Sequence, residues 1–382
     1  MIETGALEQM YAVVESVYRT PPALAATDAN RHLELTLSSK KNREPSPEKR
    51  GTPDEQQSLP RRQTSEFDLS SIMWEPSGTL GTASDVHLFL KAGFGAQTTP
   101  NKNTTVAAMP APTTTSATLT SAAGLAVGDL IIFTVATGAR REVTRILTIA
   151  TNDITFNTIS VAPDVPGAAV SGVNYKLASN ITESLSIFKY YNAGGFKQAV
   201  YGSFVNRIQV TFDGTKEVML AISGPAGEYA DTTFGTVQAK PGSHTTAGTP
   251  ASGLVGNFYV DGVAFLVIAA TVTIDNALEL RNKELGTSLA TGLAGRGNLR
   301  KVTGSVTFYL EDTNLLGKAN NVTHGVLRLV VGQTNGFMVS AVLPNVEFEI
   351  PDVGNEIGPK ELTIEYVAYA VNGNDAVTLN ES

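Results

Sequence analysis

The stretch ATVTIDNALELRNKELGTSLATGLAGRGNLRKVTGSVTFYLED, residues 270–312, decides the fold. From Val302 to Glu311, apolar residues or glycine alternate with polar residues. A period of two with β-branched and aromatic side chains is typical of a strand with one buried face. Residues 270–275 alternate in the same way. We therefore predict two long strands joined by about twenty residues, more than a hairpin loop usually contains.

The connection between these two strands, at 281–300, is rich in glycine and basic. It carries four cations against the single acid Glu284, a local charge of +3, namely Arg281, Lys283, Arg296 and Arg300. A loop of this length is either disordered or an arm that holds something. We predict an arm, and low charge elsewhere in the chain makes its cations candidate contacts with a neighbouring molecule.

A second candidate arm covers residues 38–63. Between residues 40 and 62, four acids are interleaved with seven cations, a local charge of +3, namely Lys40, Lys41, Arg43, Lys49, Arg50, Arg61 and Arg62. Prolines at 45, 47, 53 and 60 predict that it has no regular structure. The segment is either a solvated surface loop or an arm that meets an acidic surface of another molecule. The interleaved acids argue against a nucleic-acid tract.

Composition limits the classes of function. The 382 residues carry a net charge of −8, which argues against general affinity for nucleic acid. The chain has no cysteine, and its four histidines lie far apart, so no metal site is expected. No catalytic or cofactor-binding motif is present, so we expect neither catalytic residues nor a cofactor. Neither a secretory signal nor a membrane-spanning run is expected.

Alternating segments continue along the chain and predict a mainly β protein. Within residues 113–178, strands are predicted at regular spacing, at 130–135, 141–149, 153–159 and 173–178. We interpret this part as an inserted small β-barrel or sandwich. The predicted division is therefore 1–112, 113–178 and 179–382. A short helix is predicted at 84–92, and the polar residues 372–382 are predicted to form a tail.

Several segments resemble tail tube proteins, also called major tail proteins, of long-tailed bacteriophages. The most distinctive are TIDNALELRNKELG at 273–286 and RKVTGSVTFYLED at 300–312. The others are ESVYRTPPALAATDANR (15–31), RRQTSEFDL, PSGTLGT and LKAGFG (within 61–95), SLSIFKYY (184–191) and PKELTIEYVAYA (359–370). The resemblance covers most of the chain except 113–178.

The resemblance implies a β-sandwich of two packed antiparallel sheets with short flanking helices. It implies that six copies close a ring and that stacked rings form a tube around a tape-measure protein, with tail-end proteins as further partners. DNA would pass through the lumen without sequence-specific binding. The arms 38–63 and 281–300 would join adjacent rings, and 113–178 would decorate the outside. The protein would be made in the host cytoplasm and reside in the virion tail.

Two other functions remain open at this point. One is a different structural role in the virion, as a capsid decoration or baseplate component. The other is a carbohydrate-active enzyme or lectin-like module built on a β-sandwich. For a tube, the net charge of −8 leads us to expect an acidic channel wall that repels DNA phosphates.

Overall fold

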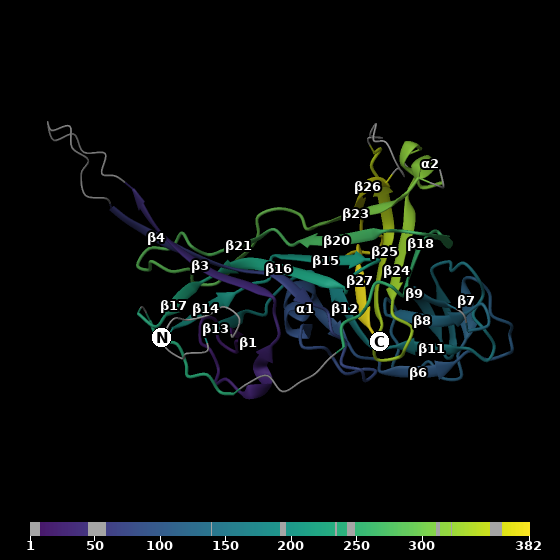
Figure 1. Ribbon diagram of the computed structural model, residues 1–382, viewed down its shortest axis with the longest axis horizontal. Coiled ribbons are helices and arrows are strands. Elements are labelled where there is room, and N and C mark those ends of the chain that lie inside the picture. Colours follow the sequence, from purple (N-terminus) through teal and green to yellow (C-terminus); the bar gives the residue numbers. More distant parts are fainter. Residues whose placement is uncertain are drawn as a thin grey trace.

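The computed structural model describes residues 8–44, 59–138, 140–191, 196–233, 235–242, 249–310, 314–321, 323–351 and 361–382. Antiparallel strands dominate these ranges (Figure 1). The described helical elements are short: the 3-10 turn η2 (Ala26–Asp28) and the helices α1 (His87–Phe94) and α2 (Asn314–Asn320). The prediction of a mainly β protein with short helices is confirmed.

The stretch that decides the fold forms β20 (Ala269–Asp275) and β23 (Lys301–Tyr309), which pair antiparallel over the whole of β20 and residues 301–307 of β23. Their apolar positions point into the core, where Val272, Val302 and Phe308 are 2–3% exposed. The predicted alternation is thus confirmed. Burial of such side chains stabilises the fold by roughly 1.5–3 kcal/mol each.

These strands lie in the middle of a sheet that we call layer A. Alternate residues of its strands face a core shared with the other layers, which fixes their register. Its strand order is β26 (Glu361–Ala368), β23, β20, β15 (Arg207–Asp213), β16 (Met219–Ala226), β4 (Leu59–Met73) and β3 (Glu34–Glu44).

The remaining strands of the same 14-stranded sheet form layer B, which packs against layer A across that core. Strand β25 connects the two layers, because its residues 346–348 pair with β26 whereas 339–342 pair with β27. The packed antiparallel sheets predicted from the family resemblance are therefore confirmed. The strands of layer B are β19 (Val263–Phe265), β18 (Gly256–Val260), β24 (Gly325–Val331), β25 (Val339–Phe348), β27 (Thr378–Glu381), β12 (Val173–Leu177) and β5 (Gly95–Thr98).

A five-stranded sheet covers the other end of layer A, where it contacts β3, β4 and β16. One of its faces contributes Met10, Ile187 and Val200 to the shared core. Its other face carries a smaller aromatic cluster that includes Tyr11 and Phe188. The strands are β17 (Glu228–Asp231), β14 (Lys197–Ser203), β13 (Leu185–Tyr190), β1 (Gln9–Val14) and β2 (Ala29–Asn30).

A separate six-stranded sheet with its own core contains most of the predicted insertion. We call it the module sheet; its strands gather at the lower right of Figure 1. They are β6 (Lys102–Thr105), β11 (Ala168–Ser171), β8 (Leu130–Val135), β9 (Arg140–Ala150), β10 (Asp153–Phe156) and β7 (Ser116–Thr118). The sheet thus begins before 113, whereas residues 173–177 pair within layer B. The domain division stays a prediction.

The chain enters and leaves the module from neighbouring strands. Strand β5 precedes the module and β12 follows it, and the two pair antiparallel with Thr98 opposite Asn174. The interface between module and layer B is apolar, formed by Leu130, Ile132, Val143, Val170, Val330, Met338 and Val342. The module therefore packs onto the body mainly through apolar side chains.

A buried ion pair lies in this interface. Arg328 of β24 and Glu142 of β9 are both fully buried, with the guanidinium Nη1 3.3 Å from the carboxylate. The same nitrogen donates to the Val143 carbonyl at 3.0 Å, and the Ser160 N–H donates to Glu142 at 2.9 Å. The guanidinium also lies 5.0 Å from the centre of the Tyr259 ring. These directional contacts fix how the module is oriented on the body.

We expect Arg328→Leu to lower the free energy of unfolding by about 3 kcal/mol, because it leaves the buried Glu142 carboxylate without its cation. Adding Glu142→Leu is expected to recover most of that loss, since two apolar side chains replace two desolvated charges. Urea denaturation of both variants measures the difference. A double variant that is less stable than Arg328→Leu alone would contradict this account.

The last residues of the chain do not form the predicted tail. Strand β27 is buried between β12 and β25, and Leu379 and Asn380 are 0% exposed. Glu381 accepts hydrogen bonds from the Tyr175 hydroxyl at 2.6 Å and the Trp74 indole N–H at 3.0 Å. The prediction failed because the polar side chains of this segment bond to residues far away in the sequence.

Glu381 also corrects the start of the predicted helix. It accepts the Ser84 N–H at 3.0 Å, so Ser84 belongs to the segment held by β27 and does not cap the helix. Helix α1 starts three residues later than predicted, at His87, and ends at Phe94, where it is followed by Gly95 with a φ of +84°. Glycine adopts that left-handed conformation without strain, so the helix ends there.

Candidate assembly surfaces

Strands β3 and β4 extend as a two-stranded hairpin well past the rest of the molecule, at the upper left of Figure 1. The described parts of the predicted arm 38–63 are therefore strands, with Lys41 paired to Gln63 and Arg43 to Pro60. The expectation that prolines prevent regular structure is wrong for Pro60. Strand β4 pairs with β16 only over residues 65–73, so Pro60 has one partner strand and one free side.

The predicted contact residues of this hairpin are placed unequally. Lys40 is exposed near the point where the hairpin leaves the body. Arg62 is half-buried, and its guanidinium donates to the Glu284 carbonyl of the other arm. The side chains of the remaining cations lie outside the described residues, namely Lys41, Arg43, Lys49, Arg50 and Arg61.

The arm at 281–300 contains a small hairpin, β21 (Leu278–Leu280) paired with β22 (Leu293–Arg296). Arg281 and Lys283 are exposed, and Arg281 pairs with Glu284. Leu285 beside them is 101% exposed. A leucine that contributes nothing to its own core, next to exposed cations, is suited to contact another molecule.

The two predicted arms lie side by side. The Gln63 N–H donates to the Ser288 carbonyl at 3.3 Å, next to the contact between Arg62 and Glu284. Nothing in the sequence pattern indicated this contact, since the partners are more than two hundred residues apart. The arms therefore form one continuous surface, which we call the arm surface, formed by residues 38–44, 59–63 and 281–294.

Arg296 and Arg300, also predicted as contacts between copies, bind their own chain. Arg296 donates to the Asn276 carbonyl at 2.9 Å, and Arg300 donates to the Ala178 carbonyl at 2.6 Å. Arg300 also donates to the Asn276 side chain at 2.9 Å. Burial, and then the charge of Arg296, lower the pKa of Arg300 to about 10. Both guanidiniums hold the base of the arm against the body, and a role between copies stays a prediction.

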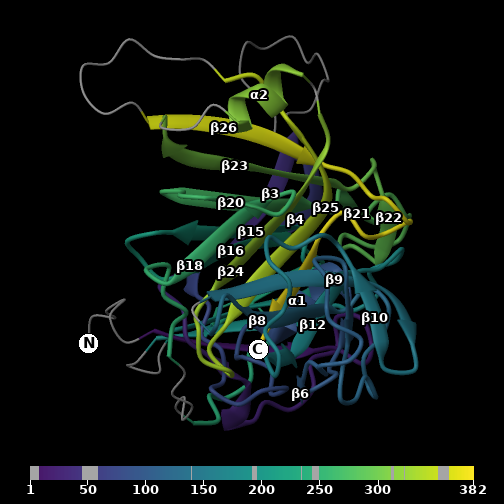
Figure 2. The ribbon, with the colours of Figure 1, turned by 90° about the vertical axis from the view of Figure 1, so that its right-hand side faces the viewer.

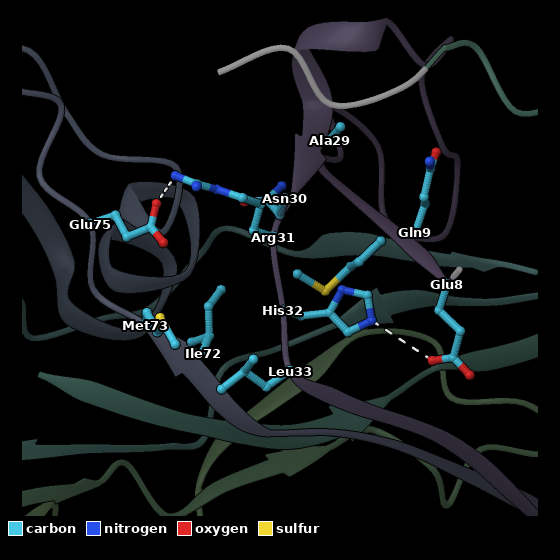
Figure 3. A pocket seen from close by; sticks show the side chains of 11 residues that line it. Glu8, Gln9, Ala29, Asn30, Arg31, His32, Leu33, Ile72, Met73 and Glu75 are labelled. Carbon is cyan, nitrogen blue, oxygen red and sulfur yellow. Dashed lines mark ion pairs between the residues drawn. The ribbon is translucent and has the colours of Figure 1, made fainter. Parts of the chain in front are cut away.

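A cavity of about 310 Å³ lies beside β1, where Figure 3 shows two ion pairs on its opposite sides. On one side Arg31 pairs with Glu75. On the other, Glu8 lies 2.9 Å from Lys189 Nζ and 3.8 Å from His32 Nε2. The charged groups are paired within the chain, whereas Asn30 Oδ1 and Arg31 Nε are buried without a hydrogen-bond partner among the described residues. Burial is the main cause of a lowered pKa of His32.

The lowered pKa of His32 predicts a pH dependence of stability. Unfolded histidine binds a proton near pH 6.5, whereas buried His32 binds one only at lower pH. The unfolded state then binds more protons below about pH 6.5, so stability falls as the pH falls from 7 through that range. We expect His32→Gln to weaken this dependence in urea denaturation at several pH values. The exposed His324→Gln is the control, and equal slopes in both variants would contradict the prediction.

Among the residues that the structure describes, no group of three or more carboxylates and histidines is arranged to hold a metal ion. No helix in the described ranges has the length and apolar character needed to cross a membrane. The features that stand out are a β-sandwich, a projecting hairpin and the arm surface.

Such a molecule is a structural β protein with extended surfaces for contacts outside its own fold. The sequence profile of the phage tail tube protein family matches residues 5–379, nearly the whole chain. The chain belongs to that family, as the sequence resemblance predicted. It is a structural component of the bacteriophage tail and assembles with itself and other tail proteins into a tube. No curated protein sequence matches it.

Proposed function

We propose that six copies of this chain close a ring and that stacked rings form the tail tube. The tube encloses a tape-measure protein before infection and later conducts DNA into the host. The chain is made in the host cytoplasm, acts without catalysis and needs no cofactor. The observation that carries the proposal is the β3–β4 hairpin, which extends layer A beyond the body (Figure 1).

Strand edges support the ring. Layer A ends at β3, and layer B ends at β19, so each sheet has a strand with one unpaired side among the described residues. Unpaired strand edges are templates for pairing with another chain, and a closed ring removes them. Val263 in β19 is 48% exposed, and Leu266 directly after it is 89% exposed. A sheet edge flanked by exposed apolar side chains fits a contact between copies within a ring.

The arm surface supports the stacking. Its exposed cations Lys40, Arg281 and Lys283 belong to a chain whose net charge is −8, so the body of another copy is on balance acidic. Opposite charge on two unlike surfaces of the same molecule favours head-to-tail contact. A head-to-tail contact that does not close on itself produces a filament. Rings joined in this way therefore give a tube.

Electron microscopy of the purified chain over a range of concentrations tests the proposal. We expect rings at low concentration and tubes of constant diameter at high concentration, with sixfold symmetry in averaged end views. Higher salt is expected to favour rings over tubes, because it screens the charges of the arm surface. A chain that stays monomeric at every concentration and salt would overturn the proposal.

A further inference from the structure

One face of layer A is rich in hydroxyl side chains, with Ala269 and Val367 as apolar exceptions. The residues that alternate with the buried ones in β15, β20, β23 and β26 align in rows across the sheet. One row reads Gln209, Thr273, Thr303, and the next reads Thr211, Thr271, Ser305. We call this surface the hydroxyl face, formed by Gln209, Thr211, Thr271, Thr273, Thr303, Ser305, Thr307 and Thr363.

Two pairs of hydroxyl groups on this face are bonded to one another. Thr271 and Ser305 lie 2.9 Å apart through their side-chain oxygens, and Thr307 and Thr363 do the same at 2.9 Å. The Ser305 N–H also donates to the Thr271 hydroxyl at 3.0 Å. Short side chains that satisfy each other leave no long, flexible group to hold a passing molecule.

Charges are confined to the margins of the face. At one end Arg207 and Lys301 stand on either side of Asp275 in a single row, so cations and an acid alternate. At the β26 margin, Glu361 and Glu365 are exposed. The centre of the face is uncharged. Proteins bind DNA phosphates through lysine and arginine. Here Asp275 lies between Arg207 and Lys301 and offsets part of their positive charge.

The layers of the molecule show which side this face is on. Layer B lies behind the buried face of layer A, and the module sheet packs behind layer B through β18, β24 and β25. Figure 2 shows β26, β23 and β20 at one end of the view and β6, β8 and β10 of the module at the other. The hydroxyl face and the module therefore lie on opposite sides of the sandwich.

We propose that the hydroxyl face lines the channel of the tube and faces the DNA that moves through it. The inference rests on the proposed ring and specifies its inner wall. A channel lined by self-bonded hydroxyls stays hydrated and offers duplex DNA no array of cations, so the polyanion slides past without being held. This wall is uncharged at its centre and carries acids such as Asp213 and Glu365 only at its margins, unlike the acidic wall expected from net charge.

The position of the face can be tested because the natural chain has no cysteine. Thr273→Cys and Thr303→Cys each place one thiol on the face, and Thr155→Cys on β10 places one on the module as a control. Tubes of each variant are labelled with a maleimide-linked gold cluster and imaged by electron cryomicroscopy. We expect gold inside the channel for the first two variants and outside the wall for Thr155→Cys.

The outcomes separate the two proposals. If the unchanged chain forms no tubes, the proposed function fails, and this inference falls with it. If tubes form but the gold on Thr273→Cys and Thr303→Cys lies outside the wall, only the inference is wrong. If both variants block assembly while Thr155→Cys permits it, the face is buried between copies and the inference is also wrong.

A second measurement tests the chemistry of the wall. Tubes of the unchanged chain are expected to retain no short duplex DNA at moderate salt. Tubes with Thr273→Lys and Thr303→Lys are expected to retain it, with retention that falls steeply as salt rises. The matched control Thr155→Lys is expected to behave like the unchanged chain. Retention of DNA by unchanged tubes, or none by the lysine variant, would overturn the proposed role of the hydroxyls.

Discussion

Replacing residues 42–62 by an Asn-Gly turn is expected to abolish tube formation while the body stays folded. In the natural chain Lys41 pairs with Gln63, so a two-residue turn between them closes a shorter hairpin with allowed geometry. The replaced part lies beyond the region in which β4 pairs with β16. Only the projecting ribbon is removed, and with it the proposed contact between rings.

Two measurements check this result. The variant should unfold in urea at nearly the same midpoint as the unchanged chain, and electron microscopy should show rings or monomers but no tubes. Arg62→Ala is the matched control, because it removes the contact with Glu284 and keeps the ribbon. Tubes of normal length from the shortened variant would show that the hairpin does not join rings.

Removing residues 378–382 is expected to prevent stable folding altogether. Strand β27 pairs with β12 on one side and β25 on the other, so its loss opens layer B in the middle. It also removes Leu379, which is 0% exposed, and leaves the donors of Tyr175 and Trp74 buried without acceptors. Each buried donor left unpaired costs about 1–3 kcal/mol, against a total stability of about 5–15 kcal/mol.

A point substitution measures part of the same effect. Glu381→Ala is expected to lower the free energy of unfolding by about 3–5 kcal/mol, because it leaves three buried donors unpaired. Glu381→Gln keeps one accepting oxygen and is expected to cost less. The exposed Glu217→Ala is the control. If Glu381→Ala unfolds at the same urea concentration as the control, these bonds do not stabilise the fold.

Strands were predictable where one face is buried and the other is not. In β23 successive residues point alternately into the core and away from it. The alternation of apolar and polar residues therefore predicts the strand. Strand β8 lies at its predicted range 130–135 but is buried on both faces, and a continuous apolar run indicates it. The family resemblance added the packing of two antiparallel sheets, which periodicity does not reveal.

The remainder depended on partners far away in the sequence. Asn380 looks like a tail residue, yet its amide donates to the Asn174 side chain at 3.0 Å inside layer B. Arg300 looks like a surface cation, yet it holds the carbonyl of Ala178. Buried polar groups are stable only with such partners, and no local pattern shows whether a partner exists. The adjacency of the two arms was hidden for the same reason.

The pairing of β5 with β12 has a practical consequence for protein engineering. Thr98 and Asn174 pair directly in layer B. The chain segment between them is therefore a cassette whose two ends lie next to each other. A short turn can replace that cassette, or a foreign domain with nearby termini can occupy its place, once Val330, Met338 and Val342 are made polar. The hydroxyl face lies on the opposite side of the sandwich, so in the proposed tube such payloads would be displayed along the exterior.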